Sequence, residues 1–156
     1  MPKSHATRTK VVHYVCAALL LILLFFQFTP FWHYGESGEA AASISSYIWF
    51  PTNHADLTAH LQSTVDADFV INDILITNIL VLVLGAIGAV LCVVKAGEFI
   101  VSLLPAACGL SGIVGFLAHP AMRLGSSWVP QLLLCMAVLA LSACSLWAEG
   151  KRTVAA

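Results

Sequence analysis

The sequence predicts an all-α membrane protein, a four-transmembrane-helix bundle with a small extracytoplasmic cap. Of the 156 residues, 60% are hydrophobic and 10% are charged, and the mean hydropathy is +0.91. Soluble domains carry about 25% charged residues. The apolar residues gather in four stretches of 18 to 21 residues, long enough for an α-helix to cross about 30 Å of hydrocarbon. We expect residues 1–156 to form a single membrane domain with spans at Val11–Phe28, Ile74–Val94, Phe99–Leu117 and Val129–Trp147.

The first span is predicted to remain on the protein. Basic residues precede it, as in a secretory signal, but its apolar run is longer than the roughly 7 to 15 residues of such signals. The first small-residue site, Ala40–Ala42, also lies far beyond it. Pro30 suits a helix end, because its ring clashes with the preceding turn. The aromatic residues around it predict a belt at the membrane surface, formed by Phe28, Phe31, Trp32, His33 and Tyr34.

Local patterns define the other three spans. Asn72 or Asp73 can cap the second span by accepting hydrogen bonds from its first-turn amides. Only Lys95–Glu98 separates this span from the third, so the two helices should be antiparallel neighbours. Pro105 predicts a kink in the third span. The fourth span carries a tryptophan near each membrane surface, Trp128 and Trp147.

Charge is distributed unequally between the two sides of the predicted bundle. Six of the seven Lys and Arg residues flank one side, and Arg123 alone is on the other. By the positive-inside rule, both termini are cytoplasmic while Gly35–Asp73 and Ala118–Ser127 face outward, as in a multi-pass protein of the plasma (cytoplasmic) membrane. The outer side then has one basic and six acidic residues, a net charge of −5. This charge disfavours nucleic acid and anionic ligands there.

Small residues recur along the second and third spans at intervals of about four, a spacing that lets helix backbones approach closely. They predict packing within one bundle or, alternatively, dimerisation through such a face. We expect bulky replacements of Ser111 or Gly112 to disturb assembly more than a bulky replacement of Ser102. The predicted packing residues are Gly85, Ala89, Ala107, Ser111, Gly112 and Gly115.

All five cysteines lie inside the predicted spans, so none can link the outer segment through a disulfide. They are expected to be small packing residues. The alternative is a thiol-based metal or redox site, because three of them fall in the cytoplasmic half of the membrane: Cys16, Cys92 and Cys144.

The outer segment Gly35–Asp73 is too long for a simple connection and predicts partial order. Ser43–Phe50 is rich in β-branched and aromatic residues and predicts a short strand. Asn53–Gln62 begins with a suitable N-cap and predicts a short helix, whereas Asp66–Asp73 alternates polar and apolar residues like a second strand. Three aromatic residues form the predicted interaction surface, or else anchor the cap to headgroups or to its own core: Tyr47, Trp49 and Phe50.

His54, Asp56 and His60 form the sharpest chemical pattern in the cap. On a helix, Asp56 and His60 are four residues apart and share a face, a spacing that suits a divalent metal. His33 or His119 could complete such a site. Solvated surface side chains are the competing interpretation. The acidic run before the second span lacks the glycine and the terminal glutamate of an EF-hand calcium loop, and no cofactor is expected.

No Asp, Glu, Lys or Arg lies at membrane depth in the predicted spans, which disfavours an ion-coupled or proton-coupled transporter. We therefore predict a non-enzymatic protein that acts in assembly, as a homo-oligomer or as a small accessory subunit of a larger membrane complex, with lipid and another protein as its partners. A passive channel or carrier component is the first alternative, with Asn78, Gln131 and Pro105 as its polar and kinked elements. A small metal-dependent membrane enzyme or sensor is the second.

The order of parts is similar to that of claudin-type four-span proteins, with a large first outer segment containing strands, a tight inner turn and a smaller second outer loop. The likeness is one of layout. The chain lacks the family's tryptophan-glycine-leucine-tryptophan signature and its paired outer cysteines, so the layout carries over no residue role.

Overall fold

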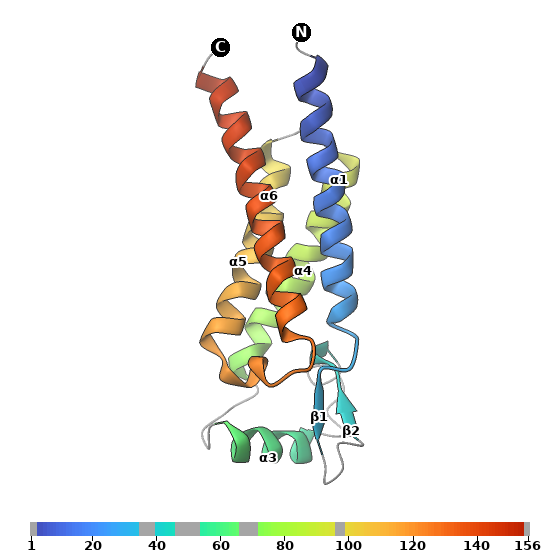
Figure 1. The fold of residues 1–156 in the computed structure, drawn as a ribbon, viewed down its shortest axis with the longest axis vertical. Helices are drawn as coiled ribbons and strands as arrows, with labels where there is room; N and C mark the ends of the chain where they lie inside the picture. Colours follow the sequence, from blue (N-terminus) through green and yellow to red (C-terminus); the bar gives the residue numbers. More distant parts are fainter. Residues whose placement is uncertain (1–2, 35–39, 46–53, 66–71, 96–98, 155–156) are drawn as a thin grey trace.

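The computed structural model of the protein describes residues 3–34, 40–45, 54–65, 72–95 and 99–154. Four long helices lie side by side along the long axis of the molecule, and a short helix and a two-stranded sheet lie at one end (Figure 1). The two ends of the chain lie together at the opposite end. The long helices are α1 (Lys3–Phe26), α4 (Asn72–Val94), α5 (Leu103–Ala118) and α6 (Trp128–Val154).

Among the described residues, three helical segments are long and apolar enough to cross a membrane: Arg8–Phe26, Ile74–Val94 and Trp128–Ala148. The predicted third span is divided, because its first residues form the 3-10 helix η2 (Phe99–Ser102) and only the 16 residues of α5 are α-helical. Pro105 lies in the first turn of α5, where its missing N–H breaks no helical bond. The structure therefore has the length and composition of a multi-pass membrane protein with three long apolar helices and one shorter one.

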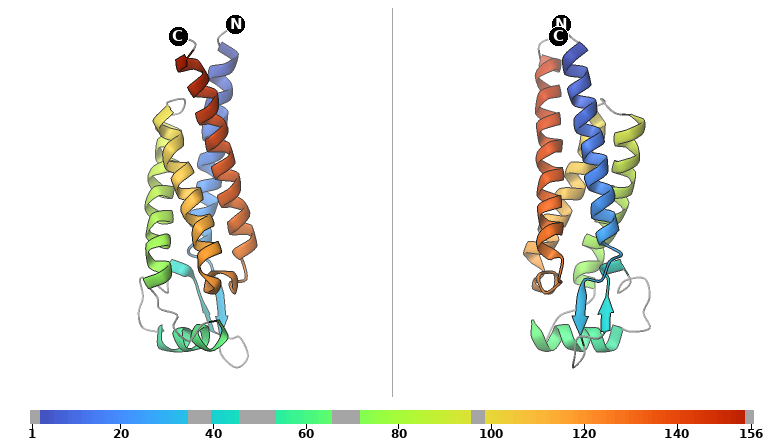
Figure 2. Two further views of the ribbon diagram at one scale, coloured as in Figure 1. Left: turned by 90° about the vertical axis from the view of Figure 1, so that its left-hand side faces the viewer. Right: turned by 45° about the vertical axis from the view of Figure 1, so that its right-hand side comes forward.

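The long helices form a closed ring of four neighbours. α1 contacts α4 and α6, and α5 contacts the same two helices, as two further views show (Figure 2). The predicted antiparallel pairing of the second and third spans is confirmed, since α4 and α5 run in opposite directions and are in contact.

The outer surface of this bundle is apolar. Leu21, Phe25, Ile76 and Leu133 are each more than half exposed. Such a surface is unusual for a protein in water, where large exposed apolar patches mark an interaction site. It is the surface expected of helices in contact with lipid.

The cap contains strands β1 (Trp32–Tyr34) and β2 (Ala40–Ala42) and helix α3 (His54–Thr64). The strands are antiparallel, with Trp32 opposite Ala42 and Tyr34 opposite Ala40. α3 lies across the end of the bundle (Figure 1) and corresponds to the helix predicted at Asn53–Gln62.

The prediction of a strand at Ser43–Phe50 is wrong at its start, where Ile44 and Ser45 are helical, and residues 46–50 lie outside the described part of the chain. The pairing of β2 ends before Ile44 for a physical reason. In the register of the two strands, the residue opposite Ile44 is Pro30, which has no N–H to donate to a sheet.

The second predicted strand, Asp66–Asp73, also differs from the structure. Its last two residues, Asn72 and Asp73, are the first residues of α4, while residues 66–71 lie outside the described part. Asn and Asp suit the start of a helix, since Asn and Asp are common in or just before a first turn.

The predicted aromatic belt after the first span is corrected by the structure. Phe28 is 64% exposed and His33 is also exposed, but Phe31, Trp32 and Tyr34 turn inward. β1 passes beneath the bundle, so its apolar side chains are enclosed between α3 and the bundle rather than facing lipid. They belong to a core formed by Phe31, Trp32, Tyr34, Ile44, Leu57, Leu61, Ile74, Phe116, Ala121 and Met122.

Candidate functional site: the cap and the polar junction beneath it

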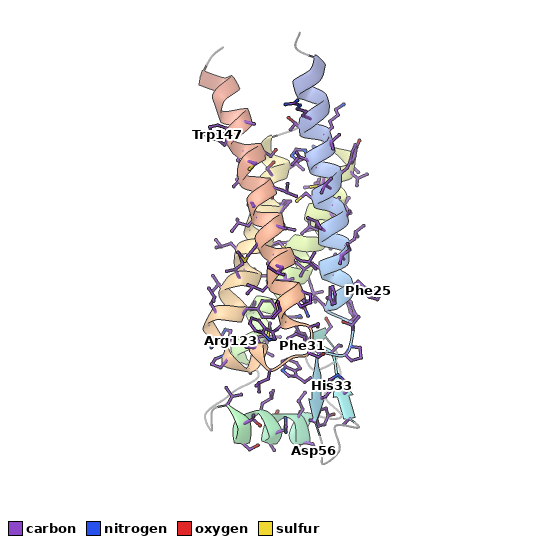
Figure 3. The ribbon with its side chains drawn as sticks, viewed as in Figure 1. Phe25, Phe31, His33, Asp56, Arg123 and Trp147 are labelled. Atoms are coloured by element: carbon purple, nitrogen blue, oxygen red, sulfur yellow. The ribbon has the colours of Figure 1, made fainter. Side chains whose placement is uncertain are left out.

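Phe31 and Trp32 attach the cap to the bundle. The two side chains are 0% and 1% exposed, and their rings meet edge to face with centroids 4.8 Å apart. The Phe31 ring also lies 6.5 Å from that of Phe116 in α5. The indole N–H of Trp32 donates to the carbonyl oxygen of Ala121 at 2.9 Å, so the large ring is buried with its polar group paired. Phe31 lies at the junction of the strands and the helices (Figure 3).

The second outer loop is joined to the same residues. It contains the 3-10 helix η3 (Pro120–Arg123). The Ser126 amide donates to the carbonyl oxygen of Phe31 at 2.7 Å, and the Phe31 amide donates to the carbonyl oxygen of Ala42 at 2.8 Å. A Cβ at Gly125 would clash with the Phe31 ring. These contacts join both outer segments into one unit.

α3 has an apolar face toward the bundle and a polar face away from it. Leu57 and Leu61 are four residues apart, share a face, and are 1% and 0% exposed. Asp56, Ala59 and Ser63 are exposed. Asp56 lies at the end of the molecule farthest from the chain termini (Figure 3). The polar face of α3 is therefore directed away from the helix bundle.

The predicted metal ligands differ in environment. Asp56 is exposed and His60 is half-buried, while the side chain of His54 lies outside the described residues. Within the described part of the chain, no group of three His, Cys, Asp or Glu side chains could hold a metal ion. The site at His54, Asp56 and His60 therefore stays a prediction.

Gln27 joins three helices directly beneath the cap. It follows the last residue of α1, and its side-chain Nε2 donates to Oε1 of Gln131 in α6 at 2.8 Å. Its Oε1 accepts a hydrogen bond from Nδ2 of Asn78 in α4, also at 2.8 Å. Gln131 donates in turn to the Ser127 hydroxyl at 3.1 Å. All three amide side chains are at most 4% exposed. Their mutual bonds offset part of the cost of burying them in an apolar bundle, while Oδ1 of Asn78 is buried without a partner among the described residues.

The structure thus brings together the two in-span polar residues selected from the sequence, Asn78 and Gln131. Both bond to Gln27, a residue that the sequence analysis did not select. Gln27 also links the bundle to the cap, because its backbone carbonyl oxygen accepts a hydrogen bond from the Ser45 amide at 3.0 Å. Its position at the end of an otherwise apolar run is the signal that could have identified it.

Three glycines of α5 lie where helices cross. A Cβ at Gly112 would clash with the thiol of Cys135 in α6, and one at Gly115 would clash with the side chain of Thr77 in α4. At Gly109, a Cβ would lie 2.7 Å from the carbonyl oxygen of Cys135. The glycines are spaced by three and are all buried, so they allow the close backbone approach typical of membrane helices.

The other predicted packing residues occupy two environments. A Cβ at Gly85 would lie 3.2 Å from the side chain of Leu24 in α1, and Ala89 is 5% exposed. Ala107 and Ser111 are only half-buried. The buried face of α5 is therefore offset from the predicted series of Ala107, Ser111 and Gly115, and it consists of Pro105, Cys108, Gly109, Gly112, Gly115 and Phe116.

A second buried polar cluster lies toward the end of the bundle that carries the termini. Nε2 of His13 is 2.9 Å from Oγ of Ser102 and 3.1 Å from Oγ of Ser145. The three side chains are 1% to 4% exposed and connect α1, η2 and α6. His13 is 89 and 132 positions from these serines, so sequence spacing does not reveal the cluster.

Two of the three cysteines predicted in the same half of the membrane also meet. The side chains of Cys16 in α1 and Cys92 in α4 lie in one buried cluster, and Sγ of Cys16 is 3.7 Å from Oγ of Ser142. Both thiols are buried, whereas Cys144 is exposed on α6. The Cys16–Cys92 contact therefore belongs to the packing between α1 and α4.

The aromatic residues of the predicted interaction surface, Tyr47, Trp49 and Phe50, lie outside the described residues, and that surface stays a prediction.

No protein-family model, no curated protein and no solved structure matches the chain.

Proposed function

We propose that this chain is a non-enzymatic multi-pass membrane protein whose outer cap presents a surface for assembly, with further copies of itself or with a larger membrane complex. The attachment of the cap carries the proposal. Trp32 is enclosed between the strands and the second outer loop and bonds Ala121 at 2.9 Å. A surface anchored in this way loses little conformational freedom when a partner docks, and this favours binding.

The proposed protein crosses the membrane four times. η2 and α5 follow one another without a break from Phe99 to Ala118, and at about 2.0 and 1.5 Å per residue they span about 32 Å. The hydrocarbon layer is about 30 Å thick. Exposed apolar side chains on α5 support lipid contact along this helix: Leu110, Val114 and Leu117.

The proposed orientation places the termini in the cytoplasm of a cell bounded by this membrane. Arg8, Lys10 and Lys95 lie toward the end of the bundle that carries the termini, whereas Arg123 and Asp56 lie toward the cap (Figures 1 and 3). This distribution supports the orientation, because Lys and Arg are concentrated in cytoplasmic segments.

Labelling of single cysteines tests the orientation in a background without the native cysteines. Ala59→Cys is the reporter for the cap, because Ala59 is exposed on α3; Ser45, at 2% exposed, is unsuitable. Lys95→Cys is the matched reporter at the other end, because Lys95 is exposed and lies just outside the segment Ile74–Val94. An impermeant maleimide should label Ala59→Cys in intact cells and Lys95→Cys only after permeabilisation. The reverse pattern would overturn the orientation.

The buried amides support assembly over a passive channel. A channel lined by Asn78 and Gln131 would need their amides directed toward a water path. Both instead bond Gln27 at 2.8 Å, and this use of their polar groups holds α1, α4 and α6 together.

Cross-linking from the cap tests assembly directly. A photoreactive amino acid at Ala59 on α3 should give one adduct of defined mass in native membranes, and Leu117, 65% exposed on α5, is the control position on the bundle. Native mass spectrometry after mild detergent extraction should give either a multiple of 16.6 kDa or the mass of a heteromeric complex. A 16.6 kDa monomer without an adduct at position 59 would overturn the proposal.

A further inference from the structure

An apolar groove runs along the seam between α1 and α4. Its volume is about 420 Å³. Val90 and Val94 are 60% and 70% exposed, so the groove opens on the outer surface of the bundle. Small side chains on α4 leave this space beside the leucines of α1. The groove is lined by Leu21, Leu24, Ala86, Ala89, Val90, Val93 and Val94.

Two contacts define how α1 and α4 are aligned. Leu20 packs against Gly88, and Leu24 packs against Gly85. The two residue numbers add to 108 in the first pair and to 109 in the second, as expected for antiparallel helices in one register. This register gives, for each residue of α4, the residue of α1 that lies at the same height along the bundle.

Two lysines lie at one end of the groove. Lys95 directly follows Val94, which lines the groove, and the register places Lys95 level with position 13 of α1. Lys10 is three residues farther, about 5 Å along the helix axis. It is also eleven residues from Leu21, about three full turns, so both lie on the same side of α1. Both lysines are exposed, and an apolar groove therefore ends at two cations.

We propose that this groove binds an anionic phospholipid, with an acyl chain against the apolar lining and the phosphate headgroup between Lys10 and Lys95. The complementarity is both apolar and ionic. Basic residues between membrane helices on the cytoplasmic side attract anionic headgroups, and the lysines lie at the end of the bundle proposed to be cytoplasmic. A zwitterionic lipid has the same chains but no net negative charge. The proposal requires α1 and α4 to lie in the membrane and is independent of the assembly role of the cap.

Lipid binding to the full-length protein, followed by native mass spectrometry in detergent, tests the headgroup contact. Phosphatidylglycerol should bind more tightly than phosphatidylcholine. Lys10→Ala and Lys95→Ala should each weaken phosphatidylglycerol binding about fivefold and leave phosphatidylcholine binding unchanged. Arg123→Ala, at the cap end, is the matched control and should have no effect. Equal affinities for the two lipids in the wild-type protein would overturn the proposal.

Ala86→Phe tests the groove itself. Ala86 is exposed, so a larger side chain fills the groove without entering the bundle core, and binding of both lipids should weaken. Val114→Phe, at a position 52% exposed on α5, is the control for an added ring on the apolar surface. Unchanged binding to Ala86→Phe would overturn the proposed acyl-chain contact. Displacement of phosphatidylglycerol by inorganic phosphate would show a simple anion site and would also overturn the proposal.

Discussion

The indole N–H of Trp32 donates to the carbonyl oxygen of Ala121 at 2.9 Å, across 89 positions of sequence. The bond connects β1 to η3, and therefore joins the cap to the loop between α5 and α6. Trp32 and Ala121 are each 1% exposed, so neither group can turn to water if the other is removed. This contact acts together with the hydrogen bond from the Ser126 amide to the Phe31 carbonyl oxygen.

Trp32→Phe should destabilise the protein more than the loss of ring volume alone. Phenylalanine keeps an apolar ring but removes the indole donor, so the buried Ala121 carbonyl oxygen keeps only the longer bond from the Leu124 amide at 3.3 Å, and the lost hydrogen bond costs about 0.5–1.5 kcal/mol. Thermal unfolding in detergent measures the loss. Trp147→Phe is the control, because Trp147 is 67% exposed and its replacement should change the stability by less than about 0.5 kcal/mol. Equal melting temperatures for the two variants would contradict the prediction.

Gln27 and Gln131 should be energetically coupled. Gln27→Met and Gln131→Met each leave a buried amide without its partner at 2.8 Å, whereas the double variant removes both groups. Polar pairs between membrane helices contribute about 0.6–1.7 kcal/mol, and a double-mutant cycle on unfolding free energies should return a coupling in that range. Gln27→Met should be the more destabilising single change, because it also removes the acceptor of the hydrogen bond from the Asn78 side chain. Strictly additive effects would argue against the junction.

Gly109→Ala should separate α5 from α6. The added Cβ would lie 2.7 Å from the carbonyl oxygen of Cys135 and 3.1 Å from the amide nitrogen of Leu139. Backbone atoms cannot rotate away, so overpacking should cost about 1–3 kcal/mol. Gly150→Ala is the matched control, because its Cβ would meet nothing within 4 Å and alanine favours a helix by up to about 1 kcal/mol. Thermal unfolding followed by circular dichroism compares the two variants, and an unchanged melting temperature for Gly109→Ala would contradict the prediction.

Ser102→Leu should be more destabilising than Ser111→Leu, the reverse of the order expected from sequence. Ser102 is 1% exposed and lies 2.9 Å from Nε2 of His13, so leucine there both overpacks the site and removes a partner of a buried imidazole. Ser111 is half-buried and is not among the buried residues of α5. The fraction of protein that stays monodisperse after heating compares the two variants directly, and a greater loss for Ser111→Leu would refute this order.

The cap should stay folded without metal. Leu57 and Leu61 are almost fully buried in the core beneath α3, and replacing Leu61 by alanine should cost about 2–5 kcal/mol. Treatment with a chelator should leave the hydrogen exchange of α3 unchanged, whereas Leu61→Ala should accelerate it. His60→Ala is the control for the predicted metal ligands and should resemble the wild type. Rapid exchange of α3 after chelation would instead support the metal site.

Local sequence patterns were sufficient to predict the long helices, the short helix of the cap and the unequal distribution of basic residues. Each of these depends on local properties: the length of an apolar run, the spacing of Leu57 and Leu61 along one face, and the identity of charged residues between spans. A helix satisfies its backbone hydrogen bonds within its own segment. Such an element can therefore be predicted from composition and periodicity along a short stretch of chain.

The positions of the strands, the members of the polar junction and the packing face of α5 could be identified only in the tertiary structure. Ala40–Ala42 has little intrinsic β preference and forms a strand because β1 supplies its hydrogen-bond partners. Gln27 and Gln131 are 104 positions apart, and their pairing depends on how four helices close into a ring. Aromatic residues beside a span resemble a membrane-surface belt in sequence, yet Phe31 and Trp32 became a buried core because β1 turns beneath the bundle. These features result from contacts between distant segments, which local sequence patterns do not encode.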